Sequence, residues 1–113
     1  MGVKRVEELI AFQLAQRFKR QVFAIVRKYP EAYNDFRYRG QLWDAASSGE
    51  SNIDEGFHRF NPKEFRRFLS IARASLAEAR TRLLDGADRE YFPRDECLPI
   101  AALGSSAIAT VTA

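Results

Sequence analysis

Apolar residues recur at spacings of three and four along most of the chain, a pattern that is typical of amphipathic helices. The first such stretch predicts a helix from Val6 to Tyr29. Pro30 ends it, because proline lacks an amide hydrogen and disfavours helix in the residue before it. The buried face of this helix is expected to comprise Ala11, Leu14, Ala15, Phe18, Val22, Ile25 and Tyr29.

A tyrosine-rich link, "EAYNDFRY", precedes a second predicted helix over Phe36–Phe57. Its inward residues are small, so a neighbouring backbone can come close. The segment "SSGES" in its middle has weak helix propensity, since glycine costs about 1 kcal/mol relative to alanine. We therefore expect a bend there. The inward positions are Leu42, Ala45, Ala46, Gly49, Ile53, Gly56 and Phe57.

The third helix has the clearest start signal. Asn61 is a good N-cap, Pro62 suits the first helical position, and Glu64 lies three residues beyond the cap, as in a capping box. Asp85-Gly86 is expected to end this helix. Its apolar stripe comprises Phe65, Phe68, Leu69, Ala72, Leu76, Ala79 and Leu83.

A fourth helix is indicated near the carboxyl end, but Pro99 and Gly104 weaken its pattern, so we expect it to be short or irregular. With no competing β-pattern, the sequence predicts an all-α, up-down four-helix bundle. Its 113 residues suffice for a single domain, 1–113. The positions of the fourth helix that could pack are Leu98, Ala101, Ala102, Ala107, Ile108 and Val111.

Positive charge is concentrated in the third helix and the link before it. The chain has 18 Lys and Arg against 15 Asp and Glu, a net charge of +3, but residues 59–82 hold seven basic side chains and two acidic ones. Arg66, Arg73 and Arg80 are seven residues apart and form one stripe beside the apolar face, about 10 Å between neighbours. Such a row can follow a phosphate backbone. The candidate nucleic-acid-binding residues are Arg59, Lys63, Arg66, Arg67, Arg73 and Arg80.

These arginines have a second interpretation. Positions that flank a bundle core often form ion pairs with a neighbouring helix or subunit. Asp54, Glu55 and Glu64 are available as partners. Both interpretations stay open at this point, and pairing is favoured for Arg73 and Arg80.

A further apolar track lies mostly outside the predicted core faces. A small bundle cannot bury both sides of one helix in its own interior, and large exposed apolar patches usually mark interfaces. We therefore predict self-association through Leu9, Phe12, Phe23 and Trp43.

The residues needed for catalysis are scarce. His58 is the only histidine and Cys97 the only cysteine, about forty positions apart. Glu55 and His58 have the Glu-x-x-His spacing of di-iron bundles, but such a site needs a second pair. We expect no enzymatic activity, no metal and no cofactor. A single cysteine, the absence of a secretory signal and the absence of a membrane span predict a cytoplasmic protein.

The segment "SNIDEGFHRFNPKEFRRFLSIARASLAEARTRLL", with "VEELIAFQLAQRFKRQVFAIVRKYP", resembles the bacterial four-helix-bundle family of 23S rRNA intervening-sequence proteins. That family includes relatives of the accessory variability determinant of diversity-generating retroelements. Family members usually have proline where this chain has Glu50. The matching motif positions are Ser51, Asn52, Ile53, Glu55, Gly56, Phe57, Lys63, Glu64, Phe65, Phe68, Leu69, Ile71, Ala72, Ser75, Leu76 and Glu78.

The resemblance implies an up-down bundle that assembles into a homo-oligomeric, pentameric ring, and it provides no catalytic residues. Its retroelement relatives bind nucleic acid and a reverse transcriptase through basic surface. The leading hypothesis is therefore a non-enzymatic oligomer that binds RNA or DNA. The alternative is a structural or adaptor oligomer that binds a protein partner, with its arginines used in ion pairs between helices and subunits.

Overall fold

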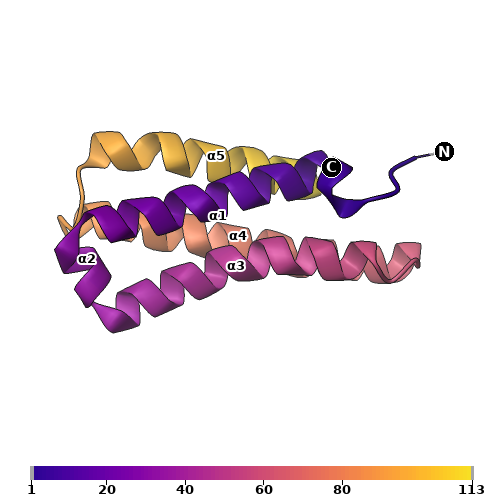
Figure 1. The fold of residues 1–113 in the computed structure, drawn as a ribbon, viewed down its shortest axis with the longest axis horizontal. Coiled ribbons are helices and arrows are strands. Elements are labelled where there is room, and N and C mark those ends of the chain that lie inside the picture. Colours follow the sequence, from indigo (N-terminus) through magenta and orange to yellow (C-terminus); the bar gives the residue numbers. More distant parts are fainter. Residues whose placement is uncertain (1, 113) are drawn as a thin grey trace.

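The structure is a computed structural model that describes residues 2–112 (Figure 1). Within this range it contains helices and no strand. In chain order the elements are a short 3-10 helix, η1 (Val6–Glu8), followed by α1 (Ile10–Lys28), α2 (Pro30–Asn34), α3 (Phe36–Phe57), α4 (Pro62–Asp88) and α5 (Arg94–Thr112).

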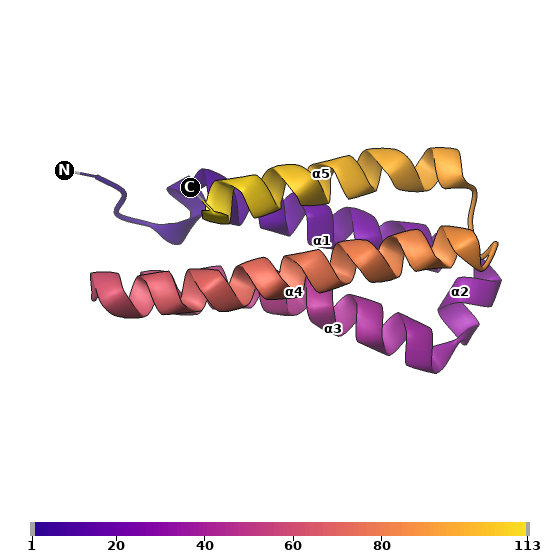
Figure 2. The ribbon, with the colours of Figure 1, turned by 180° about the vertical axis from the view of Figure 1, so that it is seen from behind.

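Four of these helices form an antiparallel bundle. Helix α1 packs against α3 and α5, and α4 packs against the same two helices, so each long helix has two neighbours around a shared core. Successive long helices run in opposite directions (Figures 1 and 2). The prediction of an all-helical bundle is confirmed. The α3–α4 connection lies farther out along the long axis than the carboxyl end of α5 in both views.

The predicted first helix is divided in two. Leu9 has extended backbone angles (φ −75°, ψ 127°), so η1 ends before it and α1 begins at Ile10. Pro30 ends α1 as expected, with Tyr29 extended, but it also starts the short helix α2. Asp35 then begins α3, because its side chain accepts a hydrogen bond from the Tyr38 amide at 3.0 Å.

Helix α3 continues without interruption through "SSGES", and its axis turns near the middle (Figure 2). The Ser48 carbonyl accepts an additional hydrogen bond from the side-chain Nδ2 of Asn52 at 2.8 Å. Side-chain bonds of this kind to the helix backbone often bend helices. The Ser48 and Ser75 hydroxyls lie 2.8 Å apart across the α3–α4 contact. The expectation that small residues allow a close neighbour is thus confirmed.

The expected end of the third helix at Gly86 is wrong. Helix α4 continues to Asp88, and Gly86 is buried inside it. A Cβ atom at this position would overlap the Tyr38 hydroxyl and the Phe92 ring. Gly86 is therefore small because two aromatic side chains occupy its neighbourhood, and it is not a helix cap.

The expectation of a short or irregular fourth helix is also wrong. Helix α5 has 19 residues, as many as α1. Pro99 lies near its amino end, where the missing amide removes one helical hydrogen bond. Gly104 is buried against α1, and a Cβ atom there would lie 2.8 Å from Phe18 Cε1. Tertiary packing therefore outweighs the weak local propensity of this segment.

We expect Gly86→Ala to lower the free energy of unfolding by about 1–3 kcal/mol, because an added methyl overpacks this contact. Tyr38 and Phe92 are both buried, and the Tyr38 hydroxyl donates to the Arg82 carbonyl at 2.8 Å, so neither ring can move without loss. Gly40→Ala is the matched control. Its Cβ would meet nothing within 4 Å, so it should stabilise α3 by about 0.5–1 kcal/mol. Urea denaturation of both variants measures this difference, and equal effects would contradict it.

Candidate nucleic-acid interface

The candidate surface begins at the tip of the α3–α4 hairpin. Asn61 caps α4 as predicted, since its side chain accepts hydrogen bonds from the amides of Lys63 at 3.0 Å and Glu64 at 3.2 Å. The reciprocal half of a capping box is absent among the described hydrogen bonds, because the Glu64 carboxylate accepts from Arg67. The cap sets the direction in which the first turn of α4 projects its basic side chains.

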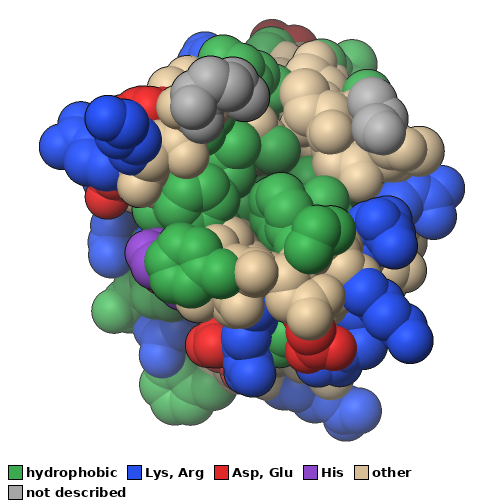
Figure 3. All heavy atoms as spheres, turned by 90° about the vertical axis from the view of Figure 1, so that its right-hand side faces the viewer, with side chains coloured by type: hydrophobic (Ala, Val, Ile, Leu, Met, Phe, Trp, Pro, Cys, Tyr) green, Lys and Arg blue, Asp and Glu red, His purple; other side chains and the backbone are tan. Residues whose placement is uncertain are grey.

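Phe60 stands at the end of this hairpin. Its φ of 54° is in the left-handed region, which non-glycine residues rarely adopt, and its side chain is 86% exposed. With Phe57 and Phe65 it lines an apolar hollow of ≈300 Å³. Figure 3 shows this end of the molecule, with apolar side chains in the centre and both basic and acidic side chains around them. The tip is therefore an apolar surface with a charged rim.

Arg59 and Arg67 both lie over the ring of Phe68. Their guanidinium carbons are 5.0 Å and 4.6 Å from the centre of the Phe68 ring. Gly56 permits this arrangement, because a Cβ atom there would lie 2.6 Å from Phe68 Cβ. The close contact of α3 with α4 thus holds the two arginines in defined positions near the tip.

Both arginines also form ion pairs with nearby carboxylates. Arg59 Nε lies 3.2 Å from Glu55 Oε2, and Arg67 Nη2 lies 3.2 Å from Glu64 Oε1. The hydrogen bond with Arg67 lowers the pKa of Glu64 and raises that of Arg67. Each pair joins residues three or four positions apart with largely exposed side chains, a class of ion pair that contributes little stability. A phosphate group could replace either carboxylate at small cost.

Lys63 and Arg66 are exposed, and neither is ion-paired with a carboxylate of residues 2–112. Arg66 borders a hollow of ≈360 Å³ between α4 and the last turns of α5, together with Arg73 and Val111. These two cations keep their full charge available to an anionic partner.

Arg73 and Arg80 reach α5, as expected for positions beside the core. Arg73 Nε donates to Thr112 Oγ1 at 3.0 Å, and Arg80 Nε donates to the Ala101 carbonyl at 3.0 Å. Both acceptors are neutral, so within residues 2–112 the expected carboxylate partners are not found. Arg80 is half-buried and joins α4 to α5, which makes it part of the bundle and a poor candidate for phosphate contact.

The predicted oligomer-interface residues differ in their burial. Phe12 lies in the core and is only 8% exposed, so its expected position on an outer apolar track is wrong. Phe23 and Trp43 are half-buried and pack on each other, with ring centres 4.6 Å apart. Leu9 is half-buried at the break between η1 and α1. The wheel of a straight helix misplaced Phe12, because η1 and Val6 cover the start of α1.

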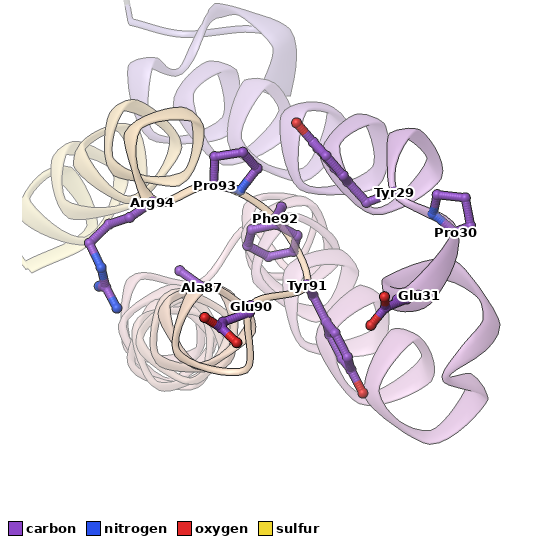
Figure 4. Close-up of a pocket in the computed structure, with 9 residues that line it drawn as sticks. All are labelled: Tyr29, Pro30, Glu31, Ala87, Glu90, Tyr91, Phe92, Pro93 and Arg94. Carbon is purple, nitrogen blue, oxygen red and sulfur yellow. The ribbon is translucent and has the colours of Figure 1, made fainter.

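A hollow of ≈550 Å³ lies at the opposite end of the bundle, between the α1–α2 turn and the α4–α5 loop (Figure 4). The hydroxyls of the two tyrosines that line this hollow already form hydrogen bonds within the chain. Tyr29 donates to Glu96 and Tyr91 donates to Asp35, and these bonds raise the pKa of both phenols. Both tyrosines thus hold the loop in place.

No metal-binding cluster is formed by the described residues, in which no three His, Cys, Asp or Glu side chains gather. His58 Nδ1 instead lies 2.8 Å from the Asp54 carbonyl at the end of α3. None of the helices within residues 2–112 has the length and apolar character needed to cross a membrane.

Comparison with known families gives a match over most of the chain. Residues 7–107 match the family described as 23S rRNA-intervening sequence protein. The chain belongs to this family. A search of curated proteins finds no match for it. The resemblance that the motif around Ser51–Glu78 indicates is therefore confirmed.

Sequence reasoning missed one basic surface of this intervening-sequence protein. Arg27 and Arg39 lie over the rings of Phe23, Trp43 and Tyr33, where α1, α2 and α3 meet. The signal was present, since Arg27 follows Phe23 by four positions and Trp43 follows Arg39 by four. The pattern predicts that Phe23 and Trp43 lie in an interface, and it gives no role to the two arginines beside them.

We expect Arg80→Ala to lower the free energy of unfolding by about 1 kcal/mol, because it removes a half-buried link between α4 and α5. Arg66→Ala is the matched control on the same stripe and should change it by less than about 0.5 kcal/mol. Urea denaturation at equal salt measures both. Equal losses would show that Arg80 is not structural.

Proposed function

We propose that this protein is a non-enzymatic, homo-oligomeric helical bundle that binds the backbone of RNA or DNA through the basic tip. We define the basic tip as Arg59, Lys63, Arg66 and Arg67. Arg73 extends this surface along α4, and Arg80 contributes to the bundle instead. The family name, which refers to a 23S rRNA intervening sequence, is consistent with an RNA partner but does not identify one.

The observation that carries the proposal is how weakly the four guanidinium and ammonium groups at the tip are ion-paired. Lys63 and Arg66 are not ion-paired within residues 2–112, and Arg59 and Arg67 have only exposed partners in their own hairpin. A phosphate contact releases counterions from the nucleic acid, which favours binding. Breaking an exposed ion pair to make that contact costs little free energy. The balance favours binding.

Self-association would strengthen such binding. A particle that repeats the basic tip presents several modest sites to one polyanion, and the second contact then benefits from a high effective concentration. The family resemblance indicates a pentameric ring. Leu9 remains the proposed contact residue, because it retains partial exposure. Phe23 and Trp43 are also partly exposed, but Arg27 lies over both rings, and its charge opposes a contact between copies there.

Binding to structured RNA and duplex DNA should be weakly sequence-specific and steeply dependent on salt. Four phosphate contacts per chain predict a slope of log K against log salt of about −3.6 for B-DNA. Lys63→Glu and Arg66→Glu should each weaken binding and reduce the slope by about 1. Fluorescence anisotropy with labelled RNA and DNA at several salt concentrations measures both quantities.

Arg37→Glu is the matched control. Arg37 is exposed near the opposite end of the bundle and lies outside every ion pair of residues 2–112, so its reversal changes the net charge equally. It should reduce binding much less than the reversals at the tip. Equal effects of all three reversals, or no binding at low salt, would reject the proposal in favour of the adaptor alternative.

Light scattering at micromolar concentration should give a particle larger than one chain. Leu9→Glu should shift it toward a single chain, because it places a charge in the proposed contact without entering a regular helix. Leu98→Glu is the control, since Leu98 is 50% exposed on α5 and outside that contact. If the wild-type protein has the mass of a single chain, the proposal of an oligomer is wrong.

A further inference from the structure

A row of four aromatic rings crosses the region where α1, α2 and α3 meet. The Phe23 and Trp43 rings have centres 4.6 Å apart, and the edge of Tyr33 meets Trp43 at 6.2 Å. Phe36 continues the row at the start of α3. Phe36 is 70% exposed and Tyr33 is 40% exposed, so the outer end of the row presents open ring faces to solvent.

Two arginines lie over these rings. The Arg39 guanidinium carbon is 4.2 Å from the centre of the Tyr33 ring and 5.0 Å from that of Phe36. The Arg27 guanidinium carbon is 5.2 Å from Trp43 and 5.7 Å from Phe23. Arg39 Nη1 also donates to the Tyr33 carbonyl at 3.0 Å, which fixes the guanidinium between the two outer rings. Cations and rings therefore alternate along one surface.

The charge on this surface is not neutralised within the described chain. Arg27 and Arg39 have no carboxylate partner among residues 2–112, and neither has Arg20, which lies seven positions before Arg27 and shares its helical face. Lys19 is the exception, because its ammonium group lies 2.8 Å from Glu50 Oε2. The surface thus combines open aromatic faces with uncompensated positive charge.

We infer that this surface, the aromatic–arginine row (Phe23, Arg27, Tyr33, Phe36, Arg39 and Trp43), binds single-stranded nucleic acid by stacking unpaired bases on its outer rings. Every base has a π-face, and proteins that bind single strands combine aromatic platforms with basic grooves. Phe36 and Tyr33 would hold bases, while Arg27 and Arg39 would contact the phosphates between them. The indole nitrogen of Trp43 is buried with no acceptor within residues 2–112.

A second copy of this chain fits the surface less well. A two-fold contact would place this positively charged surface against itself, and like charges in contact oppose association. A ring contact joins two different surfaces, and the particle-size measurement below separates it from strand binding. A nucleic-acid strand instead brings phosphates to these cations. The inference goes beyond the proposed function, which concerns backbone contacts at the other end of the bundle.

Trp43 is the only tryptophan, so its fluorescence reports directly on this row. We expect an oligo(rU) or oligo(dT) strand of about ten nucleotides to quench Trp43 emission and to bind about tenfold more weakly to Phe36→Ala than to wild type. Leu98→Ala is the matched control, because Leu98 is also an exposed apolar side chain, 50% exposed, and lies on α5 outside both candidate surfaces. Anisotropy of the labelled strand and titration of the emission measure both effects on the full chain.

The inference is supported if Phe36→Ala weakens binding of the single strand and Lys63→Glu and Arg66→Glu weaken it less. That result stands whether or not duplex binding at the basic tip is found. The inference is overturned if Phe36→Ala and Leu98→Ala bind the strand equally, or if binding leaves Trp43 emission unchanged. It is likewise overturned if Phe36→Ala reduces the particle size and leaves strand affinity intact, because the row would then be a contact between copies.

Discussion

The close approach of α3 to α4 is the constraint on which the basic tip depends. It requires small residues along the inner side of α3, where Gly56 admits Phe68 and Ser48 meets Ser75 at 2.8 Å. This contact extends the hairpin beyond the ends of α1 and α5 (Figure 2). A side chain larger than glycine at position 56 would push Phe68 away and displace the arginines beside it. The basic tip is therefore a consequence of tight helix packing.

Position along α4 decides what each of its arginines can do. At the free end of the hairpin no other helix lies alongside, so Arg59 and Arg67 find partners only in their own hairpin. Farther along, α5 runs beside α4 and its neutral oxygens take up Arg73 and Arg80. The evenly spaced stripe is divided in the same way, because Arg66 is not ion-paired within residues 2–112, whereas Arg73 and Arg80 donate to α5.

The two ends of the bundle also differ in how their polar groups are used. At the end formed by the α1–α2 turn and the α4–α5 loop, Lys28 and Tyr29 share Glu96, which lowers the pKa of that carboxyl group. Asp35 serves both the α3 amide of Tyr38 and the Tyr91 hydroxyl, and its pKa is lowered as well. The carboxylates Glu96 and Asp35 thus fix the loops at that end, whereas Glu55 and Glu64 at the hairpin tip form exposed ion pairs with Arg59 and Arg67.

Local periodicity and capping signals in the sequence determined the helical class and the Asn61 cap, because these depend on neighbours within a few residues. The motif within Ser51–Glu78 indicated the family. Tertiary structure alone decided the rest. Packing made α5 regular despite Pro99, buried Phe12 under η1, and kept Gly86 inside α4. It also decided which arginines have partners and which lie over aromatic rings. Those outcomes depend on contacts between helices distant in sequence, which the pattern of a single helix does not contain.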